Sequence, residues 1–88
     1  MGAEWTQNPD VIATDLGDEL VLLHRATRAV FTLNGTGREV WRRLEDPCTI
    51  DAAVEAVTAA FTVDEATARA DVTKLVDELV AADLARPR

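Results

Sequence analysis

The stretch RAVFTLNGTGREVW, residues 28–41, decides the fold. Its first half, residues 29–33, is an extended apolar run that predicts a short strand. Its second half predicts a helix that follows without a linker, because Thr36 and Glu39 have the spacing of a capping box. Pro47 stops this helix. The apolar side chains that fall on one stripe of the helix are Val40, Trp41 and Leu44.

Two further strands are predicted ahead of this stretch, at residues 11–14 and 20–23. Each is a short apolar run, and turn signals at residues 16–18 and 24–27 separate the runs. Three short strands with such tight connections predict an antiparallel meander.

Two more helices are predicted behind the stretch. Thr49 is the expected N-cap of the first, and a second capping box at residues 62–65 opens the longer one. Only about one or two residues join them, as in a helix-turn-helix. The predicted fold is therefore α+β, a winged helix-turn-helix with a three-stranded antiparallel sheet followed by three helices. The expected apolar faces are Ala53, Val54, Val57, Ala60 and Phe61 on one helix, and Ala68, Val72, Leu75, Val76 and Leu79 on the other.

Length and composition predict one small folded domain, since 48% of the 88 residues are hydrophobic and 28% are charged. We place the domain at residues 10–86, with residues 1–9 as an N-terminal extension. No run approaches the roughly eighteen apolar residues that a membrane span needs, and the N-terminus lacks the features of a secretory signal. Cys48 is the only cysteine, so a reducing, cytoplasmic location is expected.

The residues available for catalysis are few. Cys48 and His24 are conceivable as a nucleophilic pair. Their positions favour a plainer interpretation, a small residue in a turn and a solvated histidine at the end of a strand. The sequence has no second Cys or His with which to build a zinc site. We therefore predict that the protein is not an enzyme and has no catalytic residues, cofactor or metal.

A DNA-binding role is the alternative that the helix-turn-helix raises. The helix that would enter the groove begins with Asp64 and Glu65, which would meet phosphates with the wrong charge. The net charge of −7 also opposes binding to a duplex. A winged-helix DNA-binding regulator is therefore the less favoured function, and we predict no nucleic-acid partner.

The strand at residues 29–33 offers a positive indication of function. If it is the outer strand of the meander, one of its edges carries unpaired backbone N–H and C=O groups. No proline or lysine within it blocks pairing. An extended peptide would be able to add a strand there, in a groove against the last helix. The alternative, that the edge is simply short, stays open from these residues alone.

Residues 30–41 also resemble a family signature, in which a strand leads through Leu-Asn and a small or polar pair into a helix with Val-Trp. This is the signature of PqqD-like proteins. Residues 49–57, 61–64 and 71–84 resemble the two-helix tail of the same family, so that the resemblance covers roughly residues 10–86. Gly35 and Gly37 depart from the pattern, since larger polar residues or Ala are common there.

The resemblance implies a RiPP recognition element, a peptide-binding winged helix that captures the leader segment of a ribosomally synthesised precursor peptide. The leader is expected to add antiparallel to the third strand and to lie beside the third helix. The implied peptide-binding residues are Arg28, Ala29, Val30, Phe31, Thr32 and Leu33, with some of Ala68, Asp71, Val72, Leu75, Val76, Glu78 and Leu79. Which of these helix residues face the groove stays open at this point.

A free-standing chain of this kind looks most like the leader-binding protein of lasso-peptide biosynthesis. The implied partners are the precursor's leader peptide, a leader peptidase and a lactam-forming cyclase. An alternative is a PqqD-type peptide chaperone for a radical S-adenosylmethionine enzyme, in pyrroloquinoline quinone synthesis or another modified-peptide pathway. A third possibility is a structural subunit that docks through an apolar face.

Overall fold

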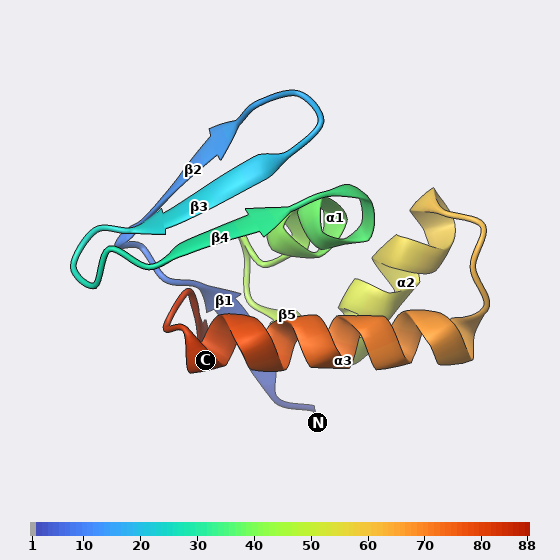
Figure 1. Ribbon diagram of the computed structural model, residues 1–88. Coiled ribbons are helices and arrows are strands. Elements are labelled where there is room, and N and C mark those ends of the chain that lie inside the picture. Colours follow the sequence, from blue (N-terminus) through green and yellow to red (C-terminus); the bar gives the residue numbers. More distant parts are fainter. Residues whose placement is uncertain (1) are drawn as a thin grey trace.

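The computed structural model describes residues 2–88, which form three helices and two three-stranded antiparallel sheets. Figure 1 shows α3 along the bottom of the view, with the β2-β3-β4 sheet, α1 and α2 on the same side of it. The α+β class and the three helices are confirmed, whereas the prediction of a single sheet is wrong. The elements are β1 (Glu4–Gln7), β2 (Val11–Asp15), β3 (Leu20–His24), β4 (Val30–Leu33), α1 (Gly35–Arg43), β5 (Cys48–Thr49), α2 (Ile50–Ala60), α3 (Glu65–Ala81) and β6 (Ala85–Pro87).

The predicted meander is the sheet β2-β3-β4, with β3 in the centre and β4 at an edge. The β2–β3 hairpin closes with a hydrogen bond from the Leu16 N–H to the Glu19 C=O, at 2.8 Å. Gly17 makes this turn possible, because its φ of +93° lies in the left-handed region that favours glycine.

An ion pair attaches the hairpin to α1. Arg38 donates to both carboxylate oxygens of Asp15, at 3.1 and 2.8 Å, and to the Gly17 C=O at 3.1 Å. Hydrogen bonding to Arg38 lowers the pKa of the Asp15 carboxyl. The contact is therefore complete at neutral pH, and it is lost only as the pH falls through the lowered folded-state pKa.

The second sheet, β5-β1-β6, was not predicted from the sequence. Its central strand, β1, pairs with residues far along the chain, Trp5 lying opposite both Cys48 and Pro87. Strands of two to four residues are too short to show alternation in a sequence. The Gln7 side chain donates to the Trp41 C=O at 2.7 Å and the Gln7 N–H to the Leu44 C=O at 2.9 Å, so that β1 is held against the end of α1.

The start of α1 differs from the prediction. The N-cap residue is Asn34, the helix begins at Gly35, and Thr36 lies inside it, so the capping box of Thr36 and Glu39 is wrong. Gly35 turns the chain sharply from β4 into the helix with a φ of +41°. A Cβ on Gly37 would come within 3.1 Å of the Leu33 side chain. Backbone geometry at these two glycines, rather than a side-chain cap, therefore makes the abrupt join.

The other two helices follow the prediction with smaller differences. Thr49 caps α2, accepting from the Ala52 N–H at 3.1 Å. The helix ends at Ala60, and Phe61 follows it with 38% of its surface exposed, so neither residue belongs to the buried face as predicted. The N-cap of α3 is Asp64 rather than Thr62, and hydrogen bonding to Thr67 lowers the pKa of the Asp64 carboxyl.

The core lies between the β2-β3-β4 sheet and the three helices. The helix residues buried in this core are those of the predicted apolar stripes, except that Ala60 and Phe61 are exposed and Leu75 is half-buried. Burial of these side chains is the main term that stabilises the fold. The buried apolar residues are Leu22, Leu33, Val40, Trp41, Leu44, Cys48, Ala53, Val54, Val57, Ala68, Val72, Val76, Leu79, Leu84 and Ala85.

The two predicted caps provide a matched pair of variants. Thr49→Ala removes the acceptor for the Ala52 N–H and should cost about 1 kcal/mol of unfolding free energy, or roughly 4–8 °C in Tm. Thr36→Ala removes no capping bond described for residues 2–88 and should cost less than about 0.5 kcal/mol. Thermal and urea unfolding measure both values, and an equal loss in the two variants would contradict the assignment of the caps.

Candidate functional site

The open edge of β4 is the first component of the site. Residues that face each other on an antiparallel pair alternate between hydrogen-bonded and non-bonded positions. The His24 N–H donates to the Ala29 C=O at 2.9 Å, which makes this a bonded pair. Given the register of β4 against β3, this alternation means that the odd-numbered residues of β4 form the hydrogen bonds to β3. The N–H and C=O groups of Val30 and Thr32 therefore point to the open edge, where no strand of residues 2–88 pairs with them.

The side chains of β4 divide between two faces. Leu33 is buried and Phe31 half-buried on the side of the core, whereas Val30, 62% exposed, and Thr32 lie on the outer face. Arg28 is not part of the strand as the sequence suggested, because its φ of 67° places it in the turn that leads to β4. The prediction that the segment forms an outer strand is confirmed for residues 30–33.

The second component of the site is α3, since Figure 1 shows β4 as the strand of its sheet nearest to this helix. The structure divides the seven predicted helix residues into an accessible group and a buried group. Asp71, Leu75 and Glu78, at helical spacing, are exposed or half-buried and are accessible to a ligand. Four others are at most 2% exposed and belong to the core: Ala68, Val72, Val76 and Leu79.

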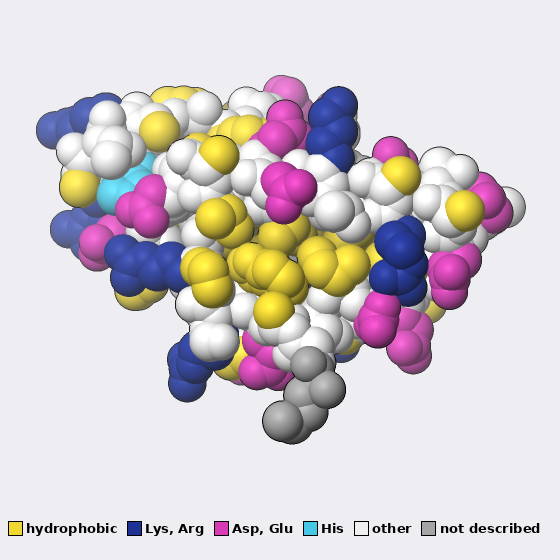
Figure 2. All heavy atoms as spheres, turned by 90° about the horizontal axis from the view of Figure 1, so that it is seen from below, with side chains coloured by type: hydrophobic (Ala, Val, Ile, Leu, Met, Phe, Trp, Pro, Cys, Tyr) yellow, Lys and Arg dark blue, Asp and Glu magenta, His cyan; other side chains and the backbone are white. Residues whose placement is uncertain are grey.

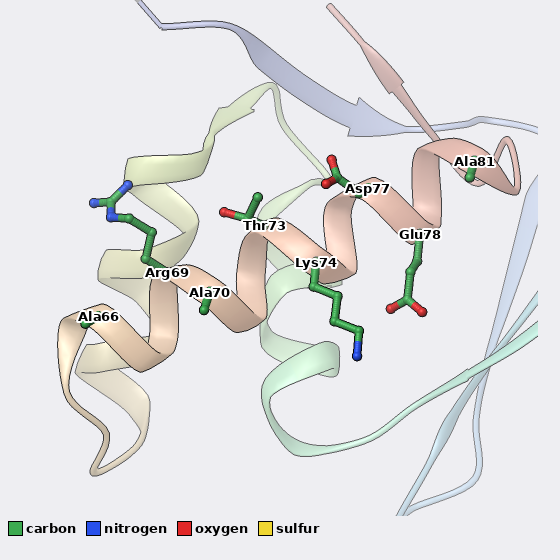
Figure 3. Close-up of a pocket in the computed structure, with 8 residues that line it drawn as sticks. All are labelled: Ala66, Arg69, Ala70, Thr73, Lys74, Asp77, Glu78 and Ala81. Carbon is green, nitrogen blue, oxygen red and sulfur yellow. The ribbon is translucent and has the colours of Figure 1, made fainter.

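Lys74 joins this wall, although the sequence analysis did not select it. Figure 3 shows the Lys74 and Glu78 side chains extending from α3 toward the side on which α1 and β4 lie. Arg69, Thr73 and Asp77 extend from the opposite side of the helix. Because Lys74 is four residues before Glu78, the helical period would have identified it. The exposed side of α3 between these two rows carries the small side chains of Ala66, Ala70 and Ala81.

The outer face of the β2-β3-β4 sheet is a second exposed feature. The strand registers align Ile12, Leu23 and Val30 in one cross-strand row. Ile12 is 48% exposed, and no element of residues 2–88 covers this face of the sheet. The continuous apolar run at residues 20–23 of β3 is typical of strands that are covered on both faces. Residues 2–88 cover only one face of this sheet.

The residues considered for catalysis do not form a site. Cys48 lies in β5 with 5% of its surface exposed, and burial raises the pKa of its thiol, which favours the unreactive protonated form. His24 is only 2% exposed, so the prediction of a solvated histidine is wrong. Its ring bonds instead to Asp83 at 3.0 Å, and no hydrogen bond within residues 2–88 joins it to Cys48.

No group of three His, Cys, Asp or Glu side chains in residues 2–88 is placed to hold a metal ion. None of the helices in this part of the chain is long and apolar enough to cross a membrane.

Comparison with known proteins identifies the family. The sequence model of the family described as Coenzyme PQQ synthesis protein D (PqqD) matches residues 19–85. The chain belongs to the PqqD family. The matched residues extend from the β2–β3 turn to the first residue of β6 and include β4 and α3. The resemblance to PqqD-like proteins is thereby confirmed.

Two solved structures resemble this PqqD-family chain. The first, TbiB1 in complex with the TbiA(beta) leader peptide, has a TM-score of 0.82 and 28% sequence identity, covering 92% of this chain and 94% of that one. The second, lasso peptide synthetase B1 complexed with the leader peptide, has a TM-score of 0.80 and 23% identity, covering 94% and 98%. A search of curated proteins found no match.

Proposed function

We propose that this chain is a non-catalytic adaptor that binds the leader segment of a ribosomally synthesised precursor peptide. The leader adds as an antiparallel strand to β4, and the adaptor presents it to the leader peptidase and lactam-forming cyclase of a lasso-peptide pathway. The observation that carries the proposal is the set of outward N–H and C=O groups at Val30 and Thr32, on an edge with no lysine or proline. The two similar structures support it, because both contain a leader peptide.

The leader would occupy the space between β4 and α3. Its backbone would pair with residues 30–33, preceded by Arg28 and Ala29, and alternate side chains would face α3. Leu75 offers apolar contact there, whereas Asp71, Lys74 and Glu78 offer charges of both signs. Leu33 and the four buried residues of α3 pack in the core behind these two walls. They affect leader binding only by holding the walls in place.

In this proposal the fold is a winged helix-turn-helix used for peptide binding. The β2–β3 hairpin is the wing, and α2 and α3 are the helix pair, joined by residues 61–64. Residues 10–86 form the peptide-binding unit. The N-terminal segment supports it through β1, which pairs with β5 and β6.

The outer face of the sheet supports the part of the proposal that concerns a protein partner. The row of Ile12, Leu23 and Val30 ends at the edge to which the leader would add. A protein that covers this row would therefore also contact the bound leader strand. We assign this face to the leader peptidase, the partner that must reach both the adaptor and the peptide.

A second pathway is favoured by the description of the matched family, which names coenzyme PQQ synthesis. In such a pathway the same edge of β4 would present a precursor to a radical S-adenosylmethionine enzyme. The strand addition is common to both pathways, and only the enzyme that recognises the loaded adaptor differs.

The structure gives DNA binding little support. Arg69, in the first turns of α3, donates to Asp51 at 2.7 Å and lies 4.0 Å from Glu65, so its charge is already paired. Figure 2 shows the face that carries α3, on which basic side chains are scattered among acidic ones rather than gathered in a patch.

Strand addition is tested by Val30→Pro. Proline removes the outward N–H of residue 30 and places its ring at the open edge, while the bonds between β3 and β4 remain. Fluorescence polarisation with a labelled synthetic leader should show binding weakened more than about tenfold, with Tm lowered by only a few degrees. Val30→Ala, which keeps the N–H, should bind within about threefold of the unchanged protein. A proline variant that binds as the unchanged protein does would refute strand addition at β4.

The assignment of the outer face is tested by Ile12→Lys. Two strands, β3 and β4, separate this residue from the leader, and it is already half-exposed, so leader binding should not change. Cleavage of a lasso-peptide precursor by its leader peptidase should fall about tenfold or more, as for a central interface residue. Ala59→Lys adds the same charge at an exposed position of α2 and serves as the control. Equal cleavage rates in the two variants would exclude this face as the docking surface.

A further inference from the structure

The buried side chain of His24 is the least expected feature of the molecule. It stands at the end of β3 with 2% of its surface exposed, and it is the only histidine of the chain. Its Nδ1 atom lies 3.1 Å from the Ala26 N–H nitrogen and 3.2 Å from that of Thr27. Its Nε2 atom lies 3.0 Å from Asp83 Oδ2. Both ring nitrogens therefore have partners, and these come from different parts of the chain.

The partners determine the tautomer of the ring. Two backbone N–H groups donate to Nδ1, so Nδ1 carries no proton. The proton is then on Nε2, where it is donated to the Asp83 carboxylate. The Asn8 amide nitrogen, 3.3 Å from Nε2, meets a donor and makes no hydrogen bond to it. The Asn8 amide donates instead to the Asp83 C=O at 2.7 Å.

On one side, the ring holds the turn that leads into β4. Residues 25–28 form this turn, which returns through Arg28, whose N–H donates to the His24 C=O at 2.8 Å. Directly after it, Ala29 accepts from the His24 N–H and starts the β3–β4 pairing. The turn therefore sets which residues of β4 point to the open edge, and Nδ1 of His24 anchors it together with Thr27 Oγ1, which accepts from the Ala29 N–H at 3.2 Å.

On the other side, the ring reaches the end of α3. Asp83 follows this helix with a φ of 58°, the left-handed conformation that ends many helices. The Leu84 N–H donates to the Leu79 C=O at 2.8 Å and the Asp83 N–H to the Val80 C=O at 3.0 Å, the two bonds of a Schellman motif. The position of the Asp83 carboxylate is therefore tied to the last turn of α3.

We infer that His24 is a positioning residue for leader binding, because its neutral ring joins the entrance of β4 to the end of α3, the two walls between which the leader lies. This inference rests on the proposed function. His24 does not itself contact the leader, since its side chain is enclosed. It acts by fixing the separation and register of the two walls, so that the groove is already formed before the peptide enters.

The sharpest test uses Asp83→Gly and Asp83→Asn. Glycine adopts a left-handed φ without strain, so the helix end is preserved while the acceptor for Nε2 is lost, and the Tm should fall by only the few degrees that one lost hydrogen bond costs. Asparagine also tolerates this conformation and keeps an acceptor oxygen. Leader binding should weaken about fivefold or more in the glycine variant, within the range for one lost hydrogen bond, and less than about twofold in the asparagine variant.

A second variant tests the same contact from the side of the ring. His24→Asn retains an acceptor for the amides of the turn but cannot reach Asp83. It should weaken binding as much as Asp83→Gly does, and the double variant should lose no more than either single one. Nitrogen NMR of the free protein should show His24 protonated at Nε2 alone.

Two results would overturn the inference: unchanged leader binding in folded Asp83→Gly, or equal losses in the glycine and asparagine variants. Failure of the unchanged protein to bind any leader would instead refute the proposed function, and the NMR result on the ring would still stand.

Discussion

The constraint on which the rest of the structure depends is the phase of the hydrogen bonds between β3 and β4. The bond from the His24 N–H to the Ala29 C=O sets this phase, and it turns the backbone groups of Val30 and Thr32 away from the sheet. A shift of one residue would exchange these roles and would also bring Val30 and Thr32 to the core side and turn Phe31 and Leu33 to the outer face. The same register therefore fixes both the buried face of β4 and its open edge.

The helix α3 connects stability and function in the same way. One stripe of it, with Val72, Val76 and Leu79, completes the core, while the neighbouring stripe, with Asp71, Leu75 and Glu78, is exposed or half-buried. Because the two stripes belong to one rigid helix, packing in the core determines where the outer stripe lies. If the leader binds between β4 and α3 as proposed, walls fixed in this way would require little rearrangement on binding, which favours affinity.

The sequence predicts what is local in this fold, and it fails where the structure depends on distant partners. Helical periodicity places α1, α2 and α3, and the apolar run before α1 gives the outer strand. The second sheet was missed because its short strands join Glu4 to Thr49 and Gln7 to Ala85. The role of His24 was missed because Asp83 is 59 residues away in the chain. The edge of the candidate site was therefore predictable, whereas the choice among α3 residues needed their burial.

The most direct measurement of the central claim is amide hydrogen exchange of β4 by NMR, with and without a synthetic leader peptide. Strand addition predicts that the N–H groups of Val30 and Thr32 exchange fast in the free protein and become strongly protected when the leader binds. The N–H groups of Phe31 and Leu33, which already bond to β3, should change far less. Leader binding that leaves the Val30 and Thr32 amides unprotected would contradict the account.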